Sequence, residues 1–202
     1  MRIVHVIPYF PPANRFGGVP ETVFSLVAAE ARQGHEITVL TTDAGLDSEL
    51  SREGITLQWH RTRTLRAMGD FGGVRILYYP NRWPRIAKHH KIFTASFWNE
   101  ESPLYIPSEI DALHLHEVHI PGYRKIAQIM KTRGARLCLS CHGSLLPPVH
   151  QGLKRLLHRV FDPYFRKDWF SDVSVYFALC REERDQLIRC GVDKSRIAIL
   201  PH

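Results

Sequence analysis

Histidines near the ends of two apolar segments are the residues of this chain best suited to chemistry. The stretch DALHLHE, residues 111–117, carries His114 and His116 two positions apart. On a β-strand such residues share one face, so both imidazole rings point the same way. A neutral imidazole can accept or donate a hydrogen bond and can bind a metal ion. His116 ends the predicted strand Ala112–His116, and open α/β sheets bind their ligands beyond the carboxyl ends of their strands.

A third histidine follows the next predicted strand, Ala135–Cys141. His142 and Gly143 come directly after that strand. Because adjacent strands of a parallel sheet end at the same edge, we expect His116 and His142 to line one solvent-filled crevice. Gly143 would allow the loop there to turn sharply. This arrangement makes His142 and Gly143 candidates for contacts with a substrate.

Two other interpretations of the histidines stay open. Both His114 and His116 could be core residues whose hydrogen bonds are satisfied inside the protein. Alternatively, the two histidines could chelate zinc together with Glu117 and His119, since a His-x-His pair on one strand face can bind this metal. The loop that begins at Glu117 leaves the directions of these side chains undetermined, and we expect no metal.

A pair of glycines marks a second candidate site near the start of the chain. Gly17 and Gly18 stand between a predicted strand, Ile3–Ile7, and a predicted amphipathic helix, Pro20–Arg32. The pair matches neither the GxGxxG nor the Walker pattern. At the start of a helix, glycine lets the backbone approach a ligand closely, and the helix amides and dipole favour an anion. We therefore predict that Gly17 and Gly18 contact the substrate.

Predicted strands and helices alternate along the whole chain. A strand at Glu36–Thr41 follows the first helix, so the chain opens with a βαβ unit, which closes right-handed into a parallel sheet. Further strands are predicted at Ile55–Trp59, Val74–Tyr79, Val173–Ala178 and Arg196–Leu200, and further helices at His90–Leu104, Pro121–Thr132, Leu153–Lys167 and Arg181–Arg189. The alternation predicts an α/β fold with a Rossmann-like, doubly wound parallel sheet of about seven strands.

The composition fits one ordinary globular domain. The chain has 202 residues, of which 44% are hydrophobic, and it contains no apolar run of about 18 residues that could span a membrane. No signal peptide is visible, so we predict a cytoplasmic protein with reduced cysteines. The CxxCH pattern at residues 138–142 resembles a haem attachment site. We reject a haem, because positions three apart on a strand point to opposite faces.

The charge of the chain is strongly basic, with a formal net charge of +7. Basic residues are interleaved with aromatic ones over residues 59–93, and a second basic segment with helical periodicity covers residues 152–170. Such surfaces can face nucleic acid, anionic lipid or phosphorylated substrates. No nucleic-acid module is recognisable, so we predict no nucleic-acid partner. Each segment is either an ordinary solvated surface or a peripheral contact with an anionic membrane, and residues 59–93 could instead hold a phosphate of the acceptor.

Several segments, taken in order, resemble the glycosyltransferases of family 4, which have the GT-B fold and transfer a sugar with retention of configuration. The matching stretches are YFPP at residues 9–12, GGV at 17–19, GHEITVL at 34–40, DALHLH at 111–116, SCHG at 140–143, and REE at 181–183 followed by IAILP at 197–201. Two positions depart from the family pattern. Ser140 stands where a Thr is usual, and Cys180 stands where a helix-capping Ser is usual.

The resemblance implies a role for most of these residues. Residues 1–202 would form the N-terminal, acceptor-binding Rossmann-like domain, and the C-terminal donor-binding domain would lie outside them, so this chain alone is not expected to turn over. A sugar would pass from a nucleotide-sugar donor to a glycan or lipid-linked acceptor, without a metal or cofactor. His116 would be catalytic and bind the donor sugar, with His114 structural. Glu117 and His142 would contact the substrate.

A non-catalytic module of flavodoxin-like fold that binds a nucleotide or phosphate is the alternative function. It would explain the βαβ unit and the glycine pair equally well. It would not explain the ordered set of motifs that continues to the end of the chain.

Overall fold

The computed structural model describes residues 1–12, 18–45, 55–59, 67–81, 107–118, 120, 122–145 and 169–201. Within these ranges, one sheet of nine strands has the order β3-β4-β5-β2-β1-β6-β7-β8-β9. The strands are β1 (Arg2–Val6), β2 (Glu36–Thr42), β3 (Thr56–Trp59), β4 (Ala67–Phe71), β5 (Val74–Tyr79), β6 (Ala112–His116), β7 (Arg136–Ser140), β8 (Val175–Ala178) and β9 (Ile197–Ile199). The described α-helices are α1 (Val19–Arg32), α3 (Tyr123–Thr132) and α5 (Arg181–Arg189).

The run of strands from β5 to β9 in this order consists of parallel neighbours, which confirms the predicted α/β sheet. The sheet has more strands than predicted. The strand β4, which was not predicted, pairs antiparallel with both β5 and β3. The sequence of β4 includes glycine and aspartate, which are depleted in strands. At Gly69 a Cβ would lie 3.2 Å from Cε2 of Tyr78, so a glycine there permits close pairing.

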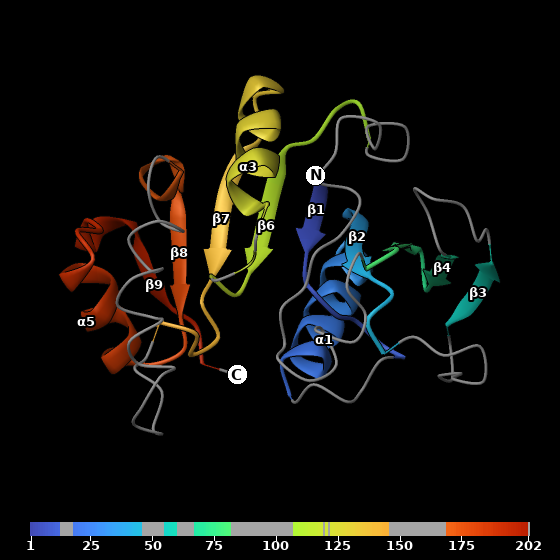
Figure 1. Ribbon diagram of the computed structural model, residues 1–202, viewed down its shortest axis with the longest axis horizontal. Helices are drawn as coiled ribbons and strands as arrows, with labels where there is room; N and C mark the ends of the chain where they lie inside the picture. The colour runs from blue at the N-terminus through green and yellow to red at the C-terminus, as the bar shows by residue number, and fades with distance from the viewer. Residues whose placement is uncertain are drawn as a thin grey trace.

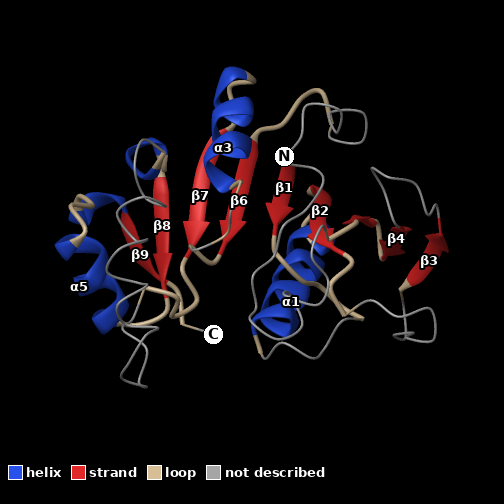
Figure 2. Ribbon diagram, in the orientation of Figure 1, coloured by secondary structure: helices blue, strands red, loops and turns tan. Residues whose placement is uncertain are grey.

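Buried apolar clusters lie on both faces of the sheet, because side chains alternate between the faces along each strand and helices cover both. On one face, α1 contributes Val23 and Val27 to a buried apolar cluster. On the opposite face, α3 contributes Ile126 and Met130, and α5 contributes Leu187. Figure 2 shows the strands as one layer with the helices packed around it.

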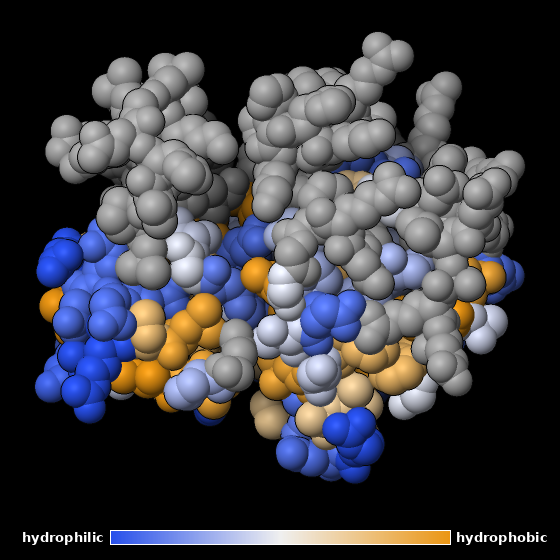
Figure 3. All heavy atoms as spheres, turned by 90° about the horizontal axis from the view of Figure 1, so that it is seen from below, coloured by the Kyte–Doolittle hydropathy of each residue, from blue (hydrophilic) through white to orange (hydrophobic). Residues whose placement is uncertain are grey.

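The parallel strands end at one edge of the sheet, toward which the arrowheads point in Figure 1. We call this the carboxyl edge, where β1, β6 and β7 end at Val6, His116 and Ser140, and we call the opposite side the amino edge. Figure 3 views the molecule from the carboxyl edge and shows hydrophilic residues gathered over the end of the sheet that carries α5. The carboxyl edge is therefore where the predicted site residues should be sought.

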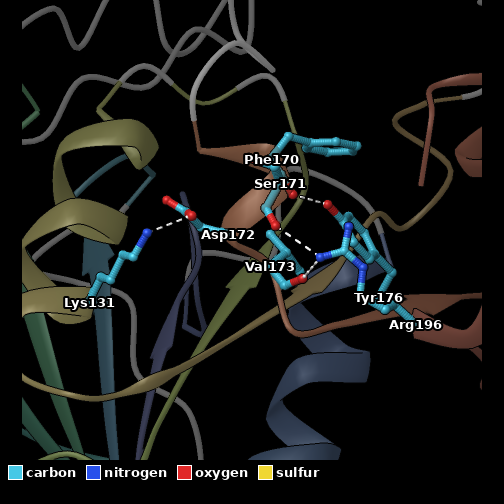
Figure 4. Close-up of polar contacts among 7 residues, drawn as sticks. All are labelled: Lys131, Phe170, Ser171, Asp172, Val173, Tyr176 and Arg196. Atoms are coloured by element: carbon cyan, nitrogen blue, oxygen red, sulfur yellow. Dashed lines mark hydrogen bonds and ion pairs between the residues drawn. The ribbon is translucent and has the colours of Figure 1, made fainter. Parts of the chain in front are cut away.

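At the amino edge, charged side chains tie a short 3-10 helix, Phe170–Asp172, to its neighbours (Figure 4). Lys131 Nζ at the end of α3 donates to Asp172 Oδ1 over 2.7 Å. Arg196 Nη1, just before β9, donates to the carbonyl oxygens of Ser171 at 2.9 Å and Val173 at 3.1 Å. These contacts fix the entry of the chain into β8.

The predicted helices agree with the structure where they can be compared. Helix α5 covers the predicted range, and α3 begins at Tyr123 instead of Pro121, after Gly122 with a left-handed φ of 95°. The predicted helices at residues 90–104 and 153–167 lie outside the described residues, as do Gly17 and His119. None of the described helices is long and apolar enough to cross a membrane. All four cysteines are free thiols, as predicted.

Candidate active site at the carboxyl edge

A line of hydrogen bonds joins three histidines and a glutamate at the carboxyl edge. Glu30 Oε2 lies 2.7 Å from His5 Nε2, and His5 Nδ1 lies 3.0 Å from His116 Nε2. His116 Nδ1 in turn lies 2.9 Å from His142 Nε2. We call these four residues the histidine chain. It begins on α1, crosses β1 and β6, and ends in the loop after β7.

The histidine chain follows from strand order and alternation. Strand β1 pairs with β6 so that His5 stands opposite His114, and β6 pairs with β7 so that His116 stands opposite Ser140. Residues two apart on a strand share a face, which brings His5, His114 and His116 together. His114 Nε2 lies 2.7 Å from Ser140 Oγ, so its ring is also hydrogen-bonded.

These imidazoles are buried. His5 and His116 are 0% exposed and His114 is 6% exposed. The expectation that His116 lines a solvent-filled crevice is therefore wrong for this structure, because neighbouring side chains cover its ring. Burial lowers the pKa of His114 well below 6.5, and the nearby His5 and His142 add to this shift. The His114 ring is thus held neutral inside the protein.

The nitrogen atoms of the three buried histidines lie close enough to ligate one ion. One ligand atom each from His5, His114 and His116 falls within 4.8 Å of the others. Among the described residues this is the set that converges, and Glu117, which the sequence suggested as a partner, is not part of it. Since His5 Nδ1 and His116 Nε2 are 3.0 Å apart, a hydrogen bond accounts for their approach without an ion.

The backbone is strained at the ends of β6 and β7. Glu117 has φ 69° and His142 has φ 51°, and these are the residues other than glycine with positive φ in the described chain. Residues with a side chain rarely adopt this conformation, and it persists only where neighbouring contacts enforce it. Both residues were predicted site residues, and both belong to loops that leave the carboxyl edge side by side.

Glutamate 183, which the sequence analysis did not single out, holds the loop after β7. Its side chain is 0% exposed, and Oε1 accepts a hydrogen bond of 2.6 Å from the backbone N–H of Gly143. Oε2 accepts a second bond of 2.7 Å from the N–H of Leu179, just before α5. Cys180 makes no capping hydrogen bond with its side chain. Glu183 therefore ties the backbone just before α5 to the loop after β7 and fixes Gly143 beside His142.

Glutamate 117 is also held in place. Its Oε1 accepts a hydrogen bond of 2.8 Å from the Tyr9 hydroxyl, and its N–H donates to the Ser140 carbonyl over 2.8 Å. Burial raises the pKa of Tyr9, and the charge of Glu117 raises it further. Tyr9 belongs to the YFPP stretch, so this stretch contributes directly to the carboxyl edge.

Glycine 18 opens α1 on the same edge, because α1 follows β1. Its φ of −82° is ordinary for any residue, and a Cβ there would meet no atom within 4 Å. The fold of this chain alone therefore does not require a glycine at position 18. This excludes backbone strain as the reason for the glycine and leaves the approach of a ligand as the prediction to test.

Comparisons with known proteins agree with this architecture. The model of the family described as Glycosyltransferase Family 4 matches residues 16–202. Among solved structures, the catalytic domain of starch synthase IV from Arabidopsis thaliana bound to ADP and acarbose is similar in fold, with a TM-score of 0.62 and 13% identity. The match covers 100% of this chain and 51% of that chain, so this chain spans about half of that chain's length. No curated protein sequence matches.

Proposed function

The chain belongs to glycosyltransferase family 4, and we propose that it is the acceptor-side domain of an enzyme that transfers a sugar from a nucleotide-sugar to a glycan or lipid-linked acceptor with retention. A second, donor-binding domain of similar size would complete the active site. The coverage of about half of the starch synthase chain supports this division, and the ADP named for that structure supports a nucleotide-linked donor.

The observation that carries the proposal is the meeting of three loops at one edge of the sheet. His116 and His142 are joined by a hydrogen bond of 2.9 Å, Glu117 and His142 have strained backbones, and Gly18 opens α1 with free space around it. Strain at ligand-binding positions is common because the surrounding contacts hold a functional geometry at some expense of stability. The ordinary surface of a fold has no need of such an arrangement.

The chemistry of retaining transfer fits this edge. Positive charge develops on the anomeric carbon of the donor while the diphosphate leaves with negative charge, so catalysis depends on positioning and electrostatics. The amides and dipole at the start of α1 favour the anionic part of a substrate near Gly18. His142, supported by His116, binds sugar hydroxyl groups, and Gly143 and Glu117 line the same site.

No metal or cofactor is needed for this proposal, since hydrogen-bond donors and the helix dipole neutralise the leaving group. A cytoplasmic location and a peripheral contact with anionic membrane stay predictions. The basic segment at residues 152–170 that suggested the contact lies almost wholly outside the described residues.

The proposal is tested on the full-length protein with a panel of nucleotide-sugars, by measuring the release of nucleoside diphosphate and the configuration of the product. We expect release with one class of donor and a product that keeps the donor's anomeric configuration. Inversion would exclude the retaining mechanism. Absence of release with every donor, in the presence of glycan and lipid-linked acceptors, would exclude the transferase.

The same proposal predicts weak binding of nucleotide-sugars by residues 1–202 alone, because most donor contacts would come from the second domain. Calorimetric titration of the 202-residue chain measures this directly. Tight nucleotide binding by this chain would favour the alternative of a non-catalytic nucleotide-binding module.

A further inference from the structure

The contacts of the histidine chain form one continuous line from Glu30 to His142, and the direction of its hydrogen bonds depends on which nitrogen of each imidazole carries the proton. We propose that Glu30 and His5 act through His116 to set the tautomer of His142, so that His142 offers an unprotonated Nδ1 to a substrate hydroxyl group. The tautomer assignment stands on its own, while its use toward a sugar hydroxyl rests on the proposed function. Glu30 and His5 are positioning residues in this scheme, since they do not touch substrate.

The direction follows from which groups can donate. An ionised carboxylate only accepts hydrogen bonds, so His5 Nε2 carries the proton in its 2.7 Å contact with Glu30. A neutral His5 then has an unprotonated Nδ1, and His116 Nε2 donates to it over 3.0 Å. His116 Nδ1 is therefore an acceptor, and His142 Nε2 donates to it over 2.9 Å. In a neutral His142 this leaves Nδ1 as the acceptor.

The direction of donation from His142 toward Glu30 requires that the three imidazoles are neutral. His5 and His116 are 0% exposed, whereas the Glu30 side chain keeps 21% exposure on α1. A buried imidazolium loses its hydration, and the carboxylate of the histidine chain, Glu30, bonds to His5. A proton added to His5 would reverse both imidazole–imidazole bonds and turn Nδ1 of His142 into a donor, while His5 Nε2 would still donate to Glu30.

Packing keeps the rings from rotating out of the chain. The rings of His5 and His116 are nearly parallel, with centroids 5.3 Å apart and an interplanar angle of 15°. Those of His116 and His142 have centroids 5.2 Å apart and an interplanar angle of 29°. Glu183 holds the backbone of Gly143 next to His142. Because the rings are held in place, the choice of protonated nitrogen that Glu30 imposes on His5 also determines the protonated nitrogens of His116 and His142.

The competing possibility is a metal ion at the buried histidines, and it requires the opposite tautomer. An ion ligated by His5 Nδ1 and His116 Nε2 needs both nitrogens unprotonated. His116 would then carry its proton on Nδ1 and donate to His142 Nε2. The position of the proton on His116 therefore decides between the two arrangements.

The test is nitrogen-15 spectroscopy of histidine side chains in the 202-residue chain, with and without added Zn²⁺. We expect His5, His116 and His142 each to carry the proton on Nε2 near neutral pH, and we expect stoichiometric Zn²⁺ to leave these signals unchanged. A proton on Nδ1 of His116 or His142, or binding of Zn²⁺ that shifts the His5 and His116 signals, would overturn the proposal.

Substitution of Glu30 tests whether this residue determines the tautomer of His142 through the two intervening imidazoles. Glu30→Gln keeps the size of the side chain but lets it either donate or accept, so the single tautomer of His142 should be lost although the two residues do not touch. Glu36→Gln, on an exposed residue at the amino end of β2, is the matched control and should change nothing. An unchanged His142 signal in folded Glu30→Gln protein contradicts the proposal.

Activity separates this inference from the proposed function. In the full-length enzyme, Glu30→Gln should lower kcat by about tenfold to a hundredfold, the usual effect of losing a supporting partner, and should alter its pH profile. If the tautomer of His142 changes and the kcat for sugar transfer does not, the assignment of His142 as a substrate contact fails while the hydrogen-bond relay stands.

Discussion

The two edges of the sheet hold polar side chains in opposite ways. At the amino edge, Lys131 reaches across the surface to Asp172, and their side chains keep 66% and 28% exposure. At the carboxyl edge, His5 and His116 are 0% exposed and bond to each other. Exposed ion pairs add little to stability, whereas buried polar groups destabilise a fold unless every partner is present. The buried polar groups of the carboxyl edge therefore need all their partners in place, which agrees with the proposal that this edge holds the site.

The removal of Glu183 should produce the largest effect, because this side chain holds the carboxyl edge together. Glu183→Ala leaves the N–H groups of Gly143 and Leu179 without their acceptor. We expect the free energy of unfolding to fall by about 2–6 kcal/mol, because each buried N–H group left without a partner costs about 1–3 kcal/mol. Urea unfolding of the 202-residue chain measures it.

Glu182→Ala is the matched control for this variant, since Glu182 is an exposed neighbour on the same helix. Glu182→Ala should lower the free energy of unfolding much less than Glu183→Ala does. Equal losses from the two variants would mean that helix α5, and not the loop at Gly143, accounts for the change.

Acidification should weaken the fold through His114. This residue stays neutral in the folded protein, because burial holds its pKa well below 6.5, whereas the unfolded chain takes up a proton near that value. Stability is therefore complete above about pH 6.5 and falls as the pH drops, by up to about 1.4 kcal/mol per pH unit for one proton. Urea unfolding at several pH values tests this. His114→Asn should give a shallower dependence, and an unchanged slope would refute the role of His114.

Alanine substitutions at two glycines should separate an effect on stability from an effect on turnover. Gly34 has φ +82°, and Gly34→Ala should lower the free energy of unfolding by about 1 kcal/mol without changing turnover. Gly18 has φ −82° and open space around it, so Gly18→Ala should leave stability unchanged. Its turnover in the full-length enzyme should fall about tenfold or more, because a Cβ would displace the substrate. Normal turnover in Gly18→Ala would remove Gly18 from the site.

The smallest effect is expected at the amino edge. Lys131→Met removes the ion pair with Asp172. The two side chains keep 66% and 28% exposure, so water already screens this contact. We expect a loss below about 1 kcal/mol that shrinks further at high salt, with no change in turnover. A loss of turnover in this variant would break the distinction between the two edges.

Much of the fold could be predicted from the sequence because its elements are local. The alternating leucines and histidines of β6 can be read from five consecutive residues. The acidic first turn and the apolar face of α5 are equally local. Strand β4 was missed because its sequence, AMGDF, contains glycine and aspartate, which are depleted in strands. The signal that could have revealed it is local: Gly72-Gly73, both with positive φ, form the tight turn that joins β4 to β5.

The site was predicted in part for the same reason. His116, Glu117 and His142 follow from strand ends, but His5 and Glu183 were missed. His5 could have been found from the strand order of doubly wound sheets, in which the first strand lies beside the one that carries His114. The sequence around Glu183 shows only that an acidic residue occupies the third position of a helix, which is a common capping pattern. The hydrogen bond from Gly143 to Glu183 depends on tertiary packing, which the local sequence does not report.

The most direct test of the account is the turnover of His142→Asn in the full-length enzyme. Substitution of His116 is less informative, since that ring is 0% exposed and its loss would leave His5 and His142 without a partner. Asparagine tolerates the φ of 51° at position 142, so the fold should persist with an unchanged Tm. We predict that kcat for sugar transfer falls by about 10²-fold, the scale of one lost positioning contact. Turnover equal to that of the unsubstituted enzyme would contradict the assignment of the carboxyl edge as the catalytic site.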